Sequence, residues 1–298
     1  MGEDSTGDGS STRRRLLGAA GAGLATALAG CGAVVDVDRR TETERRSVDP
    51  SSVSTLALTD VSGDIAFHAE SRDDVSVVVR KHALGGVSFD DLDATVRTAD
   101  DRLEVTTDEP QVVGLGGGRI DIEVHAPPSV AVDELRTVDG DVRAESVPDG
   151  ATLATTDGDV SVSDARGDVR AESRDGDIRV EETAGTLSAT TVDGDIRVQN
   201  PGRVDALRTR DGDVVADVPA AASDAVVAST DGDLLLRLGD DLSAALTART
   251  DDGEFAVSGG GSAFNVRERT ESRLRATLNG GDAAVTARTR DGDVTIRA

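Results

Sequence analysis

The chain has 298 residues and a formal net charge of −25, from 32 basic and 57 acidic side chains. It contains no Trp, no Tyr and a single cysteine. The negative charge argues against binding to nucleic-acid phosphates, the scarcity of aromatic rings argues against base stacking, and a lone cysteine excludes an internal disulfide.

The first 30 residues have the pattern of an export signal. Arg13 and Arg14 precede an apolar run over residues 16–30 that is too short, and too rich in Gly and Ala, for a membrane span. The paired arginines resemble a twin-arginine signal, and the Leu-Ala-Gly-Cys sequence ending at Cys31 resembles a lipoprotein lipobox. This resemblance implies that Cys31 carries a thioether-linked lipid, which would anchor the exported protein to the outer face of the cell membrane.

Two segments separate this signal from a long repeat region. Residues 31–52 are charged, and we predict that they form a surface tether. Residues 53–130 lack a regular period, but alternating apolar residues predict strands over 75–79, 103–107 and 120–124. We interpret 53–130 as a β-rich cap and expect a second cap at the far end, because exposed sheet edges invite pairing with other chains.

Residues 131–298 contain eight copies of Asp-Gly-Asp, one of them Asp-Gly-Glu. The copies begin at Asp139, Asp157, Asp175, Asp193, Asp211, Asp231, Asp252 and Asp291, and the first five are evenly spaced along the chain. Apolar residues alternate with polar ones on both sides of each copy, as in short strands with one buried face. A fixed period of this kind predicts a chain that coils, with one unit per repeat.

Each repeat therefore holds two strands and two turns. The second turn lies half a period from the first and is marked by Gly150, Gly167, Gly185 and Gly202. Frequent Gly and Asp, together with β-branched strand residues, exclude a helical repeat. We predict an all-β protein: a parallel β-solenoid of about 18 residues per coil with two facing sheets. Residues 259–281 interrupt the period, and we expect one degenerate coil plus an insertion there.

The Asp-Gly-Asp steps also raise the question of calcium. Calcium takes six to eight oxygen ligands, and stacked carboxylates could supply several of them. The candidate ligands are Asp139, Asp141, Asp157, Asp159, Asp175, Asp177, Asp193, Asp195, Asp211 and Asp213. The Gly-Gly-x-Gly portion of calcium-binding β-rolls is missing, so we favour a tight turn in which Gly supplies positive φ and Asp bonds the local backbone. A Ser or Thr lies two residues before every copy, and we expect its hydroxyl to bond turn backbone groups rather than to form a binding face.

The lipobox, the lead-in ending in His125-Ala126-Pro127-Pro128 and the repeated Thr/Ser-x-Asp-Gly-Asp-Val/Ile units resemble the DUF4097 family of adhesin-like proteins. The resemblance covers roughly residues 53–298. It implies a β-solenoid exported to the cell surface, and no catalytic residues are established for the family that could be carried over. Apart from the calcium considered above, we expect no cofactor. Where Ser is common in the family, this chain has Asp at the first corner position.

Three functional hypotheses follow. The leading one is a noncatalytic, lipid-anchored surface module for adhesion, envelope structure or binding of a surface protein or glycan, with no nucleic acid as partner. The first alternative is a calcium-responsive surface module. The second is a glycan-processing enzyme, which would need a groove lined by convergent carboxylates and Arg; His68, His82 and His125 lie outside the repeats and show no metal-ligand spacing.

The charge pattern also bears on habitat. An acidic surface with Lys81 as its only lysine resembles proteins of salt-loving archaea. Equivalent Asp residues on neighbouring coils would lie about 4.8 Å apart, which costs roughly 1 kcal/mol per pair in water. Because the screening length falls to about 3 Å in molar salt, we expect the exported domain to loosen at low salt.

Overall fold

The structure is a computed structural model that describes residues 39–108, 117–259 and 264–298. The predicted export signal, with Arg13, Arg14 and Cys31, lies outside the described residues. The predicted all-β class and parallel β-solenoid are confirmed: the described residues form 23 strands, and their helical segments are two short 3-10 turns, η1 (Pro50–Ser52) and η2 (Phe89–Asp91). None of the described residues forms a helix long and apolar enough to cross a bilayer.

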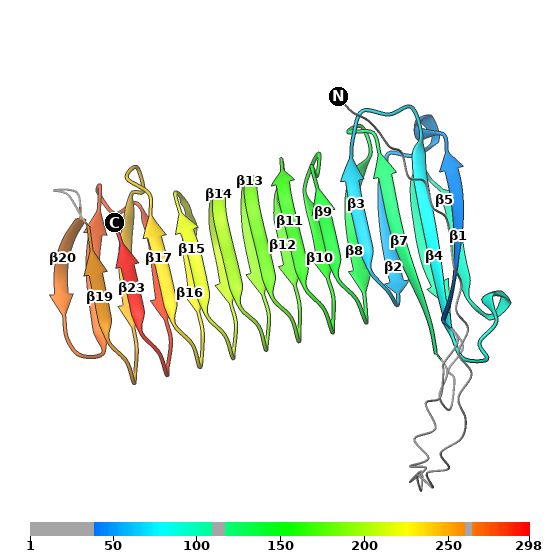
Figure 1. Cartoon of the computed structure of the whole chain (residues 1–298). Coiled ribbons are helices and arrows are strands. Elements are labelled where there is room, and N and C mark those ends of the chain that lie inside the picture. The colour runs from blue at the N-terminus through cyan, green and yellow to red at the C-terminus, as the bar shows by residue number, and fades with distance from the viewer. Residues whose placement is uncertain (1–38, 109–116, 260–263) are drawn as a thin grey trace, which may run out of the picture. The chain divides into compact units, whose positions relative to one another are not determined.

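The strands form two facing walls, which we call sheet I and sheet II (Figure 1). Sheet I contains, in spatial order, β1 (Arg39–Val48), β4 (Val75–Leu84), β7 (Gly117–Ala126), β3 (Ile65–Ala69), β9 (Val142–Glu145), β11 (Val160–Ala165), the first halves of β13 (Ile178–Thr190) and β14 (Ile196–Arg208), β15 (Val214–Val218), β17 (Leu234–Leu238), β23 (Val294–Arg297) and β19 (Phe255–Ser258). β13 and β14 continue around the second turn and join this sheet to the other.

Sheet II is built in the same way. In spatial order it contains β5 (Asp93–Ala99), β6 (Arg102–Asp108), β2 (Thr55–Val61), β8 (Ala131–Thr137), β10 (Ala151–Ala154), β12 (Val169–Glu172), the second halves of β13 and β14, β16 (Ala221–Ala228), β22 (Ala283–Arg288), β18 (Ala244–Arg249), β21 (Arg273–Leu278) and β20 (Phe264–Arg269).

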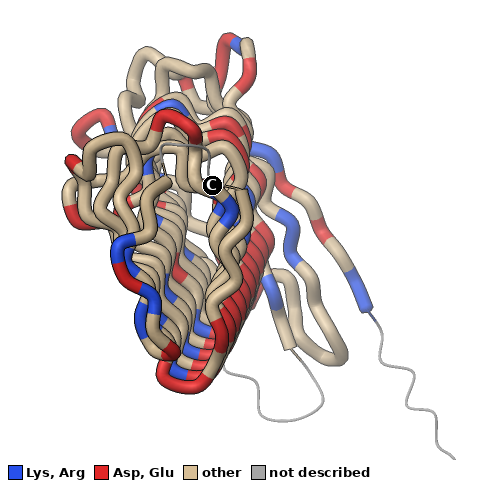
Figure 2. The backbone as a smooth tube through the Cα atoms, turned by 90° about the vertical axis from the view of Figure 1, so that its left-hand side faces the viewer, with Lys and Arg blue, Asp and Glu red and all other residues tan. Residues whose placement is uncertain are grey.

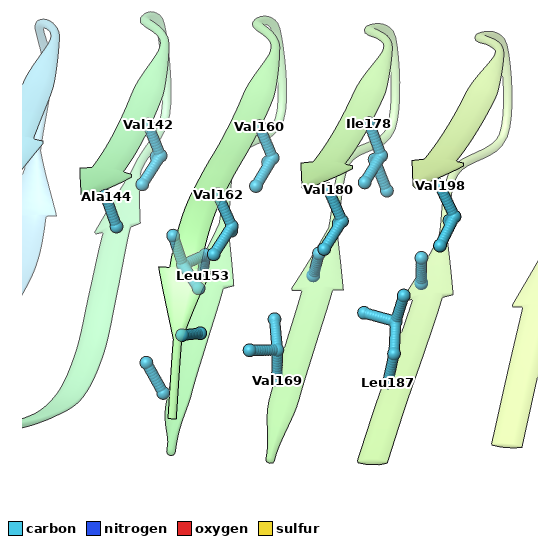
Figure 3. Packing of buried hydrophobic residues seen from close by; sticks show 14 of the residues in the cluster. Val142, Ala144, Leu153, Val160, Val162, Val169, Ile178, Val180, Leu187 and Val198 are labelled. Carbon is cyan, nitrogen blue, oxygen red and sulfur yellow. The ribbon is translucent and has the colours of Figure 1, made fainter. Parts of the chain in front are cut away.

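A thin aliphatic core fills the space between the sheets. Equivalent residues of successive coils stack in register, as Val142, Val160 and Ile178 do in sheet I, and all three are fully buried (Figure 3). Leu153 and Leu187 approach them from sheet II. Burial of one such side chain contributes about 1.5–3 kcal/mol, so the stack gains stability with each coil that is added.

The order of the coils in space differs from their order in the sequence at both ends. At the N-terminal end, the coil β2–β3 lies between β6–β7 and β8–β9. At the C-terminal end, the last coil of the chain, β22–β23, lies between β16–β17 and β18–β19. The first and last coils of the chain are therefore both enclosed by neighbours.

Antiparallel strands close the stack, as expected of caps. β4 and β1 extend sheet I at the N-terminal end, and β5 lies on β6 in sheet II. At the other end β21 lies antiparallel on β18, and β20 lies antiparallel on β21. The predicted strands over 75–79, 103–107 and 120–124 are confirmed as parts of β4, β6 and β7.

Two expectations for these ends were wrong. Within the predicted tether, residues 39–48 form β1, an edge strand whose exposed Arg and Glu side chains discourage pairing with another chain. Between residues 259 and 281 the described residues hold no degenerate coil, because β20 and β21 form a hairpin that docks on β18.

Candidate functional site

The eight Asp-Gly-Asp or Asp-Gly-Glu steps form one edge of the stack, here called the acidic corner. Figure 2 shows it end-on as a band of acidic residues along the lower edge of the coils. Each step connects a sheet II strand to the sheet I strand of the same coil. The corner carries the candidate calcium ligands, so the contacts of its three residues decide what it can do.

The second acidic residue of each step belongs to a hydrogen-bonded ladder. The backbone N–H of Asp159 donates to Oδ1 of Asp141 at 3.1 Å, and the N–H of Asp177 donates to Oδ1 of Asp159 at 2.8 Å. The same bond recurs at distances of 2.7–3.1 Å through Asp121, Asp64, Asp141, Asp159, Asp177, Asp195, Asp213, Asp233, Asp293 and Glu254, in the spatial order of the coils. One oxygen of each accepting carboxylate is therefore used to join two coils.

The glycine of each step allows neighbouring corners to approach closely. A Cβ added at Gly176 would lie 2.0 Å from the Gly158 carbonyl oxygen, and one at Gly194 would lie 2.2 Å from that of Gly176. The expected positive φ was wrong for most copies, since Gly292 alone among the eight corner glycines has one. Close stacking, rather than a left-handed turn, requires glycine here.

The hydroxyl two residues before each step has the predicted role. Thr191 is buried, and its Oγ1 donates to the carbonyl oxygen of Gly176 at 2.9 Å. Equivalent bonds of 2.7–2.9 Å are made by Thr137, Thr155, Ser173, Thr209, Ser229, Thr250 and Thr289. These hydroxyls bond turn carbonyls and do not form an exposed binding face.

The first aspartate of each step is different, because its side chain is exposed and lies beside its equivalents. Backbone bridges join Asp193 to Asp211 and Asp211 to Asp231. The pKa of Asp211 is raised by desolvation and by the neighbouring carboxyls of Asp193 and Asp231. The pKa values of Asp157 and Asp291 are raised by the same causes. For Asp291 the hydrogen bond with the Asp231 carboxyl is the largest cause, ahead of desolvation.

These contacts locate the predicted calcium ligands. Asp141, Asp159, Asp177, Asp195 and Asp213 lie in the ladder, and each gives one oxygen to the next coil. Asp139, Asp157, Asp175, Asp193 and Asp211 line the exposed edge. In the part of the chain that the structure describes, no three His, Cys, Asp or Glu side chains are grouped so that they could hold a metal ion.

The enzyme hypothesis requires a groove in which carboxylates and an arginine converge. A hollow of about 890 Å³ lies at the C-terminal end and is lined by Asp251, Asp252, Glu254, Glu271 and Arg269, among others. Arg269 donates to the main-chain oxygen of Phe255 at 2.8 Å, so its guanidinium covers the backbone of β19. Carboxylates and an arginine therefore share one hollow at the end of the stack, and this hollow lies away from the regular coils between Asp139 and Asp211.

The three histidines each lie against a carboxylate. His68 lies 3.1 Å from Glu145, His82 lies 2.9 Å from Asp121, and His125 lies 2.9 Å from Glu123. The rings of His68 and His125 stack with their centroids 5.1 Å apart. The contacts of His68 and His82 and the ring stack join neighbouring strands of sheet I at the N-terminal end, whereas His125 and Glu123 both lie in β7.

A second surface feature was missed by the sequence analysis. Four arginines and one alanine occupy adjacent positions in a row across the outer face of sheet II. Three of the arginines are exposed and one is half-buried. In spatial order this arginine row is Arg208, Ala228, Arg288, Arg249 and Arg273. The signal that could have revealed it is the heptapeptide Arg-Thr-Arg-Asp-Gly-Asp-Val, which occurs twice, over 208–214 and 288–294.

The coil, the acidic ladder and the hydroxyl ladder define a flattened, two-sheet parallel β-solenoid. Residues 53–297 match the family described as Toastrack DUF4097, and the chain belongs to that family. Comparison with curated proteins gave no match.

Three solved structures resemble the chain at low identity. A "putative cell adhesion protein" from Clostridium sporogenes is 10% identical with a TM-score of 0.33, and the alignment covers 87% of this chain and 99% of that one. A "putative lipid binding protein" from Parabacteroides distasonis is 13% identical with a TM-score of 0.45, over 85% and 96%. A "putative adhesin" from Bacteroides fragilis is 14% identical with a TM-score of 0.35, over 86% and 96%.

Proposed function

We propose that this chain is a noncatalytic surface module, held at the outer face of the cell membrane by a lipid on Cys31, whose sheet faces bind a partner outside the cell. The observation that carries the proposal is the use of the repeated residues. In each step the hydroxyl, the glycine and the second acidic residue serve contacts between coils. The repeats thus build a scaffold, and the exposed side chains of the two sheets are left to make contacts with other molecules.

The sequence supports the anchored location. Arg13 and Arg14 precede the apolar run, and Cys31 follows its last small residues. A single lipid chain gives marginal retention, so the proposal requires the two-chain attachment that is typical of lipoproteins. The described fold begins at residue 39, soon after Cys31, so the stack would be held close to the membrane.

The proposal is tested by cell fractionation. We expect the wild-type protein to sediment with membranes and to be degraded when protease is added to intact cells. Cys31→Ala should appear in the soluble or medium fraction, and Arg13→Lys with Arg14→Lys should accumulate inside the cell as the uncleaved precursor. Membrane association of Cys31→Ala equal to that of the wild type would contradict lipid anchoring at this residue.

A further inference from the structure

The arginine row is an unusual arrangement for a chain of net charge −25. Arg288 pairs in register with Arg249, and Arg249 pairs with Arg273, so three arginine side chains lie on adjacent strands. Like charges on adjacent strands destabilise a sheet. None of the four guanidinium groups in the row forms an ion pair or hydrogen bond with any residue that the structure describes.

The row also contains a hollow. Ala228 takes the place of an arginine in β16, so Arg208 and Arg288 stand on either side of a small side chain. The hollow there measures about 400 Å³, and Arg208, Arg288, Arg290 and Thr230 contribute to its lining. Asp251 is the one acidic residue in that lining. Arg208 and Arg288 have no ion-pair partner among the described residues, and a groove walled by such guanidinium groups is suited to oxyanions, which Arg binds in a bidentate manner.

The non-sequential coil order brings Arg208 and Arg288 together at this groove. Arg208 belongs to β14, whereas Arg288 and Arg290 belong to the last coil, which is inserted beside β16. If β18 followed β16 in space, as it does in the sequence, Ala228 would face Arg249 and the row would be shorter. The site therefore depends on the C-terminal coil.

We propose that the arginine row binds an acidic polysaccharide, a glycan that bears carboxylate or sulfate groups. The row crosses five strands, a span of about 19 Å at the usual strand spacing, which fits an extended polymer better than a single small anion. The adjoining row on the same face contains Val226, Thr286, Thr247 and Arg275, and its two threonines offer hydroxyls to sugar oxygens.

The composition favours a glycan over a nucleic acid as the anionic partner. The chain has no Trp and no Tyr for stacking nucleobases. The inference rests on the proposed role as a partner-binding surface module and names the class of its partner.

The test is a binding titration with the purified chain, at the lowest salt concentration at which circular dichroism shows it folded. The probes are polygalacturonate, which carries carboxylates, and dextran sulfate, with neutral dextran as the control. We expect one or both charged glycans to bind and neutral dextran not to bind. The charged glycan that binds more tightly identifies the preferred anion. Polyglutamate and single-stranded oligothymidylate are run alongside.

A double variant locates the binding. Arg208→Gln with Arg288→Gln should raise the Kd about tenfold or more, since it removes two charge-assisted contacts. The matched control is Arg179→Gln with Arg297→Gln, which removes two exposed charges from sheet I and should leave the Kd within about twofold. Equal effects of the two variants would overturn the site.

Other outcomes overturn the ligand class. If neither charged glycan binds, or if polyglutamate or oligothymidylate binds as tightly as the better glycan, the assignment to acidic polysaccharides is wrong. The titration uses purified protein and does not depend on Cys31, so failure of lipid anchoring and failure of glycan binding are separate results.

Discussion

At the scale of single residues, the hydroxyl ladder shows how a buried polar side chain is tolerated in a thin core. Thr191 is buried and its hydroxyl donates to Gly176. Thr183 is also buried, in β13, but its Oγ1 has no hydrogen-bond partner among the described residues. The same substitution at these two threonines can therefore measure how much the hydroxyl hydrogen bond contributes to the free energy of unfolding.

We expect Thr191→Val to lower the free energy of unfolding by about 1–2 kcal/mol, because it removes a hydrogen bond and leaves the Gly176 carbonyl without this donor. Thr183→Val should be neutral or stabilising, since it replaces an unpaired buried hydroxyl with a methyl group. Chemical denaturation of both variants checks the difference. A loss of stability at Thr183 as large as that at Thr191 would show that the ladder bond is not the cause.

The second turn of each coil also depends on single residues. Ser146, Asp164, Glu182 and Asn200 are equivalent positions in four successive coils, and all have a positive φ between 47° and 58°. This left-handed conformation is uncommon for residues other than Gly, Asn and Asp. Glu182 and Asn200 lie inside β13 and β14, so the bend that they make belongs to strands that pass from one sheet into the other.

At the scale of the element, the two columns of the acidic corner have opposite effects on stability. The second column accepts hydrogen bonds, as Asp213 does from the N–H of Asp233 at 2.8 Å. The first column places like charges side by side, and with desolvation this raises the pKa of Asp211 above its ordinary value of 3.8. Because a raised pKa means that the folded state binds the proton more tightly, this group favours folding at low pH. That contribution is lost as the pH rises through the raised pKa.

We therefore expect Asp211→Asn to raise the melting temperature at pH 7 in dilute buffer. The gain should shrink as the pH falls below 3.8, where the wild-type carboxyl is protonated, and should also shrink in molar KCl, where the charges are screened. Asp213→Ala removes the same charge but also the acceptor for Asp233, so it should lower the melting temperature. A gain from Asp211→Asn that persists in molar KCl would contradict the electrostatic explanation.

At the scale of the whole molecule, the coil was predictable from the sequence and the order of the coils was not. Period-two alternation around each Asp-Gly-Asp step fixes which side chains face the core, and Val142, Val160 and Ile178 are buried as that alternation requires. The steps at Asp252 and Asp291 have the same local pattern, so nothing local decides which one follows Asp231 in space.

The same reasoning explains what was missed at the candidate sites. Arg208 and Arg288 lie far apart in the sequence, and they approach each other only because the last coil is inserted beside β16. Residues 39–48 carry charge on both faces. This pattern is typical both of a solvated segment and of an edge strand, so it does not distinguish the two. Only the free edge of β4 makes that segment a strand.

The last coil, β22–β23, lies directly beside β16–β17. This position indicates that residues 240–281, which separate the two coils in the sequence, are an addition to an otherwise regular stack. The ladder bond between Asp233 and Asp293 spans 60 positions of the sequence, whereas the bond between Asp159 and Asp177 spans 18. Removal of residues 240–281 would restore the regular interval at this bond. β16 already pairs in parallel with β22, and β17 with β23, so the shortened chain would pass directly from one coil to its present neighbour in space.

We therefore expect the internal deletion of residues 240–281 to leave a folded solenoid, with hydrogen-exchange protection retained in β22 and β23. Deletion of residues 282–298 removes fewer residues but should be more damaging, because β18 and β19 lose their parallel partners in the stack. In that variant residues 240–281 should become sensitive to protease while the coils up to β17 stay protected, since each coil depends mainly on its neighbours. If residues 240–281 kept their protection without the last coil, they would form an independent unit, and the enclosed position of β22–β23 would not be what holds the C-terminal end of the stack together.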